Sequence, residues 1–180
     1  LRVGAFDLGF TLGQVQDVSL AFNEIGMARL FAVLPAEWDL PADPEIDLAQ
    51  LVDRPYVAGY DSTALGVASN RLFAEKGLVP NTVARSHAHS VAGALVERGL
   101  GFALLDLFTV HSLLRGPGRD RIVVRKVAGA EALPVVAVYP SRRKLSNAAA
   151  VFIECVEDAF ARLARDAGAR SDAACGSMEV

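Results

Sequence analysis

Two short polar segments carry most of the side chains that could do chemistry. Residues 60–63 read Tyr-Asp-Ser-Thr and residues 86–90 read Ser-His-Ala-His-Ser, and each segment lies between an apolar stretch and a run of helical periodicity. A polar turn between a strand and a helix places hydroxyls beside free backbone N–H groups, at the positive end of the helix dipole. This chemistry suits a carboxylate ligand.

The hydroxyls in these turns have a simpler alternative role. Ser and Thr are preferred N-cap residues, so Ser62 and Ser90 could do no more than cap the helices that follow. The presence of two such turns favours ligand binding, and Asp61 and Thr63 are assigned to the predicted site with them. Alanine at Ser62 or Ser90 would separate the roles, because loss of a cap lowers stability and loss of a ligand contact does not.

The histidines do not predict a metal site. His87 and His89 are two residues apart and would project alike from an extended segment, but no Cys or carboxylate accompanies them at ligand spacing. They are interpreted as exposed or capping residues, and both are assigned to the ligand site, where His89 could hydrogen-bond an effector. Asp106 follows an apolar run and could either bind a ligand amino group or cap the next element.

No catalytic residue or cofactor is predicted. Cys155 lies beside the apolar face of a predicted helix with no basic group near it in sequence, which predicts a buried, inert thiol. Glycines 99 and 101 lack the third glycine of a nucleotide-binding loop and follow a helix, so nucleotide binding is not expected.

The composition predicts a soluble cytoplasmic protein with a substantial core. Of 180 residues, 52% are hydrophobic and 22% are charged, and the formal net charge is -3. That charge gives no positive field for a phosphate backbone, so the chain itself is not expected to bind DNA. The apolar runs are too short to cross a bilayer, and two cysteines make no disulfide framework. The chain begins at Leu1 with no basic and apolar leader, so a signal peptide is expected to be absent or already removed.

The order of predicted elements indicates an α/β fold. Helices are expected from residue 65 to Gly77, from Val91 to Gly99 and after Ser146, where apolar residues repeat at helical spacing. Alternation of strands and helices predicts mixed, mainly parallel sheets covered on both faces. Buried strands are expected at residues 8–12, 28–34, 56–58, 82–85, 102–105, 122–127 and 135–138.

Three segments resemble the effector-binding domain of LysR-type transcriptional regulators, and the resemblance spans roughly residues 1–163. They are residues 4–10 (GAFDLGF), 29–35 (RLFAVLP) and 91–105 (VAGALVERGLGFALL). In that family the third segment is usually followed by a proline-containing turn, where this chain has Asp-Leu-Phe-Thr at 106–109. Thr109 together with residues 94–96 is similar to the branch that senses amino acids and opines.

The resemblance implies a two-lobed, type 2 periplasmic-binding-protein-like domain with a small effector bound between the lobes. The first lobe would comprise residues 1–34 and 135–167, the second residues 35–134, and residues 168–180 would form a disordered tail. The family's effector contacts fall on Asp61, Ser62, Thr63, His87, His89, Ser90, Asp106 and Thr109 in the second lobe and on Thr11 in the first.

The resemblance also implies partners beyond the effector. DNA would be bound through an N-terminal helix-turn-helix that this chain lacks, in a homodimer or homotetramer, with no membrane partner. The first lobe would be N-terminally truncated, would expose apolar sheet surface and would bind ligand poorly. The alternatives are a transporter's solute-binding protein, which shares the architecture, and an enzyme, for which no nucleophile, metal set or acid–base pair is visible.

Overall fold

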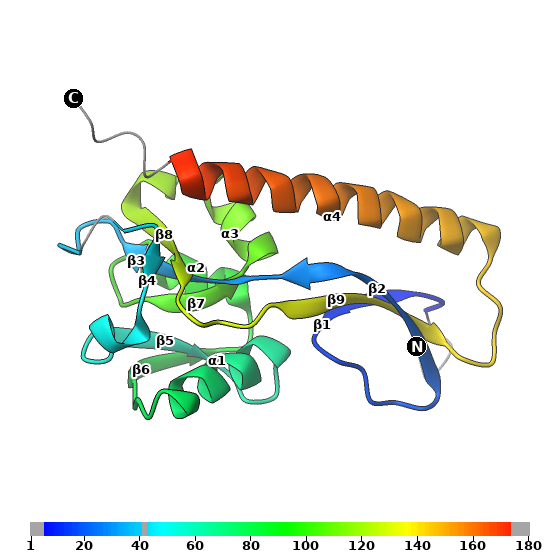
Figure 1. The fold of residues 1–180 in the computed structure, drawn as a ribbon, viewed down its shortest axis with the longest axis horizontal. Coiled ribbons are helices and arrows are strands. Elements are labelled where there is room, and N and C mark those ends of the chain that lie inside the picture. The colour runs from blue at the N-terminus through cyan, green and yellow to red at the C-terminus, as the bar shows by residue number, and fades with distance from the viewer. Residues whose placement is uncertain (1–5, 41–42, 174–180) are drawn as a thin grey trace. The chain divides into compact units, whose positions relative to one another are not determined.

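The computed structural model describes residues 6–40 and 43–173, and the chain divides into two compact units (Figure 1). Unit 1 comprises residues 1–28 and 132–166, and unit 2 comprises residues 29–131 with 167–180. The chain first crosses from unit 1 to unit 2 at Arg29, inside the stretch 28–34 that was predicted to be one strand. That stretch is divided between β2 (Leu20–Ala28) and β3 (Leu30–Pro35).

Unit 1 is built on a three-stranded antiparallel sheet in the order β1-β9-β2. The central strand is β9 (Leu133–Pro140), and β1 (Gly9–Leu12) pairs with it from Gly9 opposite Val138 to Leu12 opposite Val135. The prediction that the first strand is buried is wrong, because every residue of β1 is partly or fully exposed. The apolar side chains of Phe10 and Phe22 are 38% and 55% exposed, so this sheet presents apolar surface.

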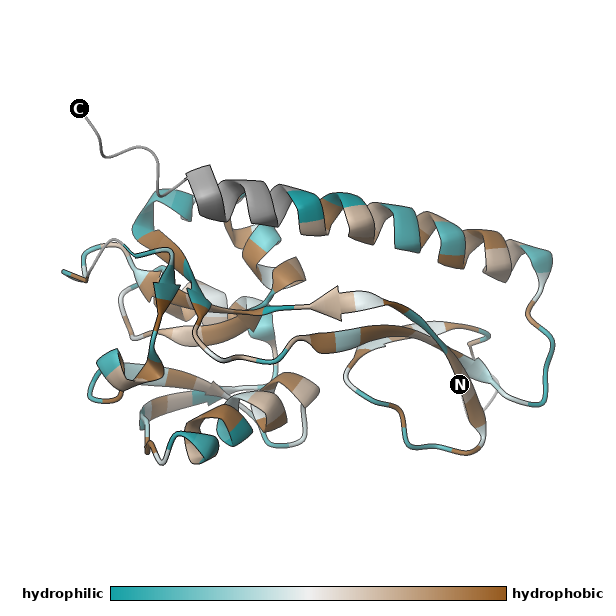
Figure 2. Ribbon diagram, in the orientation of Figure 1, coloured by the Kyte–Doolittle hydropathy of each residue, from teal (hydrophilic) through white to brown (hydrophobic). Residues whose placement is uncertain are grey.

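Helix α4 (Asn147–Ala173) packs on the sheet of unit 1 through one apolar face. Figure 2 shows hydrophilic (teal) and hydrophobic (brown) residues alternating along the helix. Ser146 accepts a hydrogen bond from the Ala149 N–H at 3.2 Å, which confirms the predicted cap. Ile153 and Phe160 are buried, and the Phe160 ring lies directly over Gly26, where any side chain would collide with it.

Two predictions about α4 are corrected. Cys155 is exposed rather than buried, because successive helical residues turn by about 100° and residue 155 lies off the line of Ile153 and Phe160. The helix also continues through Ala173, so the predicted tail does not begin at residue 168. Residues 174–180 lie outside the described part of the chain.

Unit 2 contains a four-stranded sheet in the order β4-β8-β3-β7 and a two-stranded sheet of β5 and β6. The pairs β4–β8 and β5–β6 are parallel, and β3 runs antiparallel to both of its neighbours. A single parallel bridge between Tyr56 of β5 and Phe102, the residue before β7, links the two sheets. The prediction of mixed sheets is therefore confirmed, but the sheets are not mainly parallel, since antiparallel pairs outnumber parallel pairs among the described strands. The remaining strands are β4 (Glu45–Ile46), β5 (Pro55–Gly59), β6 (Asn81–Ser86), β7 (Ala103–Asp106) and β8 (Ile122–Val127).

Helices cover both faces of these sheets. Leu72 and Phe73 of α1 (Ala64–Glu75) pack on one face, in a core that includes the rings of Tyr56 and Phe102, which are tilted by 31° with centroids 4.8 Å apart. The other face is covered by α2 (His89–Val96) and α3 (Leu107–Leu113), which touch where Leu113 lies against Gly93. Short 3-10 turns span Leu48–Gln50 and Arg119–Arg121.

Trp38, the one tryptophan in the sequence, packs against the core of unit 2. Its ring meets the edge of Phe102 with centroids 6.4 Å apart, and the guanidinium carbon of Arg54 lies 5.1 Å from the tryptophan ring. A cation over an indole face is attracted by the negative potential of the ring. Trp38 is therefore held between an aromatic core residue and a surface arginine.

Candidate functional site

Three strand-to-helix turns meet at one edge of the sheets in unit 2. Strands β5 and β6 pair in parallel, and a parallel bridge from Tyr56 to Phe102 aligns the chain leading into β7 with them. The carboxyl ends of the three strands therefore lie at the same edge, and the helices α2, α1 and α3 begin there. In open α/β sheets this edge is where ligands bind. All of the predicted effector residues except Thr11 lie in these three turns.

The turn between β5 and α1 uses most of its polar groups internally. Thr63 is the N-cap of α1: its hydroxyl accepts from the Gly66 N–H at 3.0 Å and donates to the Tyr60 carbonyl at 2.8 Å. Asp61 accepts from Asn70 at 2.7 Å and pairs with Arg85 at 3.3 Å. The cap of α1 is thus Thr63 and not Ser62, which is exposed.

The turn between β6 and α2 leaves its helix uncapped. The N-cap position is Ala88, whose side chain cannot accept a hydrogen bond, and the Ser86 hydroxyl instead donates to the Ala88 carbonyl at 2.9 Å. Ser90 lies inside the first turn of the helix, so the capping alternative is excluded for it as well. Within the described residues, no acceptor bonds the backbone N–H of His89 or Ser90.

An aromatic contact joins the first two turns. The rings of Tyr60 and His87 are stacked with centroids 3.7 Å apart and an interplanar angle of 2°. The expectation that His87 and His89 project alike is wrong, since His87 stacks on Tyr60 and His89, the first residue of α2, turns to another partner. This role of Tyr60 is not predicted from the sequence. Parallel pairing of Gly59 with Ser86 brings the two following residues side by side, so the register carries the signal.

Asp106 joins the second turn to the third. One of its carboxylate oxygens, Oδ1, accepts from the backbone N–H groups of Phe108 and Thr109 at 2.9 and 3.0 Å, which caps α3. The other, Oδ2, accepts from the Thr109 hydroxyl at 2.8 Å and lies 2.9 Å from Nδ1 of His89. The capping alternative for Asp106 is therefore confirmed. Both of its carboxylate oxygens are occupied by hydrogen bonds from the protein itself.

The surroundings of Asp106 keep it ionised although it is only 4% exposed. Burial by itself raises the pKa of the carboxyl, but hydrogen bonds from His89 and from the backbone and hydroxyl of Thr109 outweigh it, and the pKa lies below its ordinary value. An ionised carboxylate can only accept hydrogen bonds, so the proton between Asp106 and His89 resides on the imidazole Nδ1.

The predicted residue Thr11 belongs to unit 1, where it lies in β1 opposite Val136. Its side chain is exposed, and the hydroxyl donates to the Leu12 carbonyl at 3.3 Å. The structure thus brings the residues of the three turns in unit 2 together through the Tyr60–His87 and His89–Asp106 contacts.

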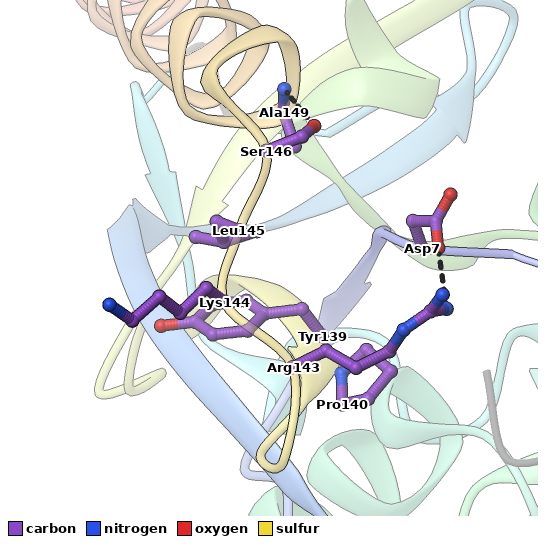
Figure 3. A pocket seen from close by; sticks show the side chains of 8 residues that line it. All are labelled: Asp7, Tyr139, Pro140, Arg143, Lys144, Leu145, Ser146 and Ala149. Atoms are coloured by element: carbon purple, nitrogen blue, oxygen red, sulfur yellow. Dashed lines mark hydrogen bonds and ion pairs between the residues drawn. The ribbon is translucent and has the colours of Figure 1, made fainter.

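Two cavities lie away from these turns. A cavity of about 250 Å³ in unit 1 lies where α4 begins, and Figure 3 shows Arg143 directed toward Asp7, with which it forms an ion pair at 3.0 Å. A cavity of about 260 Å³ in unit 2 is lined by Pro35 and Val123 at the opposite edge of the sheet from the three turns. Neither cavity is lined by a predicted effector residue.

Among the described residues, no group of three or more His, Cys, Asp or Glu side chains is arranged to hold a metal ion. In the same part of the chain, no helix has the length and apolar character needed to cross a membrane.

Comparison with known families gives a match over residues 1–161 to the LysR substrate binding domain. The chain belongs to this family. The match supports the regulator rather than the transporter protein among the alternatives, and the type 2 periplasmic-binding-protein-like fold is confirmed. A search of curated proteins found no match.

Solved structures of LysR-family proteins share the fold. HinK, a LysR family transcriptional regulator from Pseudomonas aeruginosa, is 22% identical with a TM-score of 0.73, and the similarity covers 88% of this chain and 54% of HinK. The regulatory domain of CcmR from Synechocystis, solved with 2-PG, is 12% identical with a TM-score of 0.74, covering 88% of this chain and 75% of that one. The effector binding domain of QuiR, solved with shikimate, is 18% identical with a TM-score of 0.66, covering 94% and 75%. The chain spans about half the length of HinK.

Proposed function

We propose that this LysR-family domain senses a small carboxylate or amino-acid-like effector, which it binds at the three turns of unit 2. The observation that carries the proposal is the meeting of these turns, joined by the Tyr60–His87 stack and the His89–Asp106 hydrogen bond. Exposed Ser62 and Ser90 are free of capping roles, and the N–H groups that begin α2 are available to an anion.

The ligands of two related structures support a small anionic effector. CcmR was solved with 2-PG and QuiR with shikimate, so domains of this fold accept small anions. Our assignment to the branch that senses amino acids and opines is the finer proposal, and it rests on residues 94–96 with Thr109.

The complete regulator would act on DNA and not by catalysis. We assign DNA binding to a helix-turn-helix segment outside these 180 residues, in a cytoplasmic homodimer or homotetramer. Effector binding would shift the populations of two poses of the domain, and it can do so only by the difference in its affinity for them.

Thermal unfolding with a ligand panel tests the proposal. The panel contains amino acids, opines and aromatic carboxylates, because a ligand that binds only the folded state stabilises it by mass action. A ligand at about 100 times its Kd adds about 2.7 kcal/mol, which raises Tm by roughly 5–10 °C in a domain of this size. A flat response to the whole panel would contradict the proposal.

The substitutions Ser62→Ala and Ser90→Ala locate the site. Each should weaken binding by about tenfold, the effect of one lost hydrogen bond, and leave the free energy of unfolding within about 0.5 kcal/mol of wild type. Ser141→Ala in unit 1 is the matched control and should change neither. Wild-type binding by both turn variants would place the effector elsewhere.

A further inference from the structure

His89 presents a buried nitrogen that no group of the described residues satisfies. Its Nδ1 lies 2.9 Å from Asp106, while its Nε2 is shielded from solvent and has no hydrogen-bond partner. Buried polar atoms in native proteins nearly always have a partner, so an exception requires an explanation. The imidazole side chain as a whole is 22% exposed, so the ring lies close to the surface although Nε2 itself is covered.

The hydrogen bonds of Asp106 determine which nitrogen of His89 carries the proton. Both carboxylate oxygens accept two hydrogen bonds each, and an ionised carboxylate offers no donor. Nδ1 must therefore be the N–H nitrogen, and in the neutral imidazole Nε2 is left with a lone pair. Thr109 supports this choice because its hydroxyl donates to the same oxygen, Oδ2.

We propose that Asp106 and Thr109 are positioning residues that fix His89 as the Nδ1–H tautomer, so that Nε2 accepts a hydrogen bond from the effector. The inference rests on the proposed function and narrows its ligand class. A carboxylate that meets the free N–H groups of α2 repels the lone pair of Nε2 unless the ligand also carries a donor. The preferred effector is then a hydroxy- or amino-carboxylate rather than a simple acid.

The substitution Asp106→Asn reverses the tautomer while keeping the cap of α3. The amide oxygen can still accept from the N–H groups of Phe108 and Thr109, but the amide nitrogen now donates toward Nδ1 of His89. Nδ1 becomes the acceptor and Nε2 carries the proton. Thr109→Val is the milder companion variant, since it removes one hydrogen bond to Oδ2 and leaves the His89–Asp106 bond in place.

Nitrogen NMR of the ¹⁵N-labelled chain reads the tautomer directly and needs no effector. The His89 ring should show a protonated Nδ1 in the wild type and in Thr109→Val, and a protonated Nε2 in Asp106→Asn, with the signals of His87 and His111 unchanged. A protonated Nε2 in the wild-type protein, or the same tautomer in all three chains, would overturn the inference.

Matched ligands then test the selectivity. Calorimetric titration compares propionate with lactate and alanine, and benzoate with 2-hydroxybenzoate and 2-aminobenzoate. The donor-bearing member of the set that binds should be favoured by about tenfold in the wild type, and this preference should vanish or reverse in Asp106→Asn. If the simple acid binds as tightly as its hydroxy and amino counterparts, the proposed preference for a donor-bearing ligand is wrong. If no ligand in either set binds while the NMR signals behave as expected, the tautomer stands and the proposed function fails for these acids.

Discussion

The turns before α1 and α2 have similar sequences and opposite structures. Both place Ser beside charged or aromatic residues after a parallel strand, but a side chain of the turn before α1 caps its helix, and no side chain of the turn before α2 does so. Thr63 caps α1, whereas Ala88 at the equivalent position of α2 offers no acceptor.

The difference gives the two neighbouring turns different roles: one supports the fold and the other offers hydrogen-bond donors to a ligand. A capped helix start with an Asp61–Arg85 ion pair gives a rigid support, while an uncapped start leaves donors for a ligand. Hydroxyl-containing residues occur in both turns, so they do not identify the turn that binds a ligand. The residue at the N-cap position identifies it, because a residue without a side-chain acceptor leaves the first N–H groups of the helix free.

Replacing Gly66 should have the largest effect, because it breaks the supporting turn. A Cβ at this position would collide with the Tyr60 carbonyl, although alanine in a helix otherwise stabilises by about 1 kcal/mol over glycine. Gly66→Ala should lower the free energy of unfolding by about 3 kcal/mol in urea titration. The neighbouring exposed position provides the control, Val67→Ala, which should cost less than about 0.5 kcal/mol. A stabilised Gly66→Ala variant would show that the turn is not tightly constrained.

Low pH should weaken the hydrogen bond between His89 and Asp106, which joins the second turn to the third. The pKa of Asp106 lies below its ordinary value of 3.8, so its stabilising effect is fully present above that value and is lost as pH falls through the folded pKa. Wild type should exceed Asp106→Asn in unfolding free energy by about 2 kcal/mol at neutral pH, and the gap should narrow as pH falls below the ordinary pKa of 3.8. Urea unfolding across this pH range measures the gap, and a constant gap would mean that the carboxylate is not specially stabilised.

Removal of the Thr63 cap should affect stability and leave the donors of α2 intact. Thr63→Ala should cost about 1 kcal/mol by loss of the bond to the Gly66 N–H, and Thr63→Ser should restore it. Chemical denaturation of the three chains provides the comparison. Equal stability of the alanine and serine variants would assign the cap no energetic role.

The smallest expected effect on stability comes from Ala88→Ser, which would give α2 a capping residue like that of α1. Ala88 has extended backbone angles of φ -96° and ψ 118°, which suit a capping serine. Ala88→Ser should gain about 0.5–1 kcal/mol of stability and weaken effector binding by roughly tenfold, because its hydroxyl competes for the free N–H groups. Thermal unfolding and ligand titration measure the two changes. Higher stability with unchanged affinity would exclude these N–H groups as effector contacts.

Periodicity predicted the parallel part of unit 2 well. The helix ending near Gly77 and the strand 122–127 were predicted from local pattern, and the structure places them as expected. Strand β2 was missed because Asn23, Glu24 and Gly26 interrupt its apolar pattern, and only its last residue, Ala28, is buried. Helix α3 was missed because its apolar residues continue the run of β7, with only Asp106 to mark the boundary.

The candidate site was predicted as a set of turns but not as a network. Sequence spacing identified Ser90, His89 and Asp106, yet the contact between His89 and Asp106 joins residues 17 positions apart on different elements. The stack of Tyr60 on His87 likewise depends on the pairing of two strands. Such contacts are fixed by register, which no local pattern reports.

The position of Trp38 gives the protein a built-in optical reporter for one half of the chain. Since the only tryptophan packs against Phe102 in unit 2, its fluorescence follows the melting of that unit and is blind to the antiparallel sheet of unit 1. Circular dichroism follows both units at once. Coincident transitions by the two signals would mean that the halves unfold as one cooperative body, and separated transitions would give each half a stability of its own.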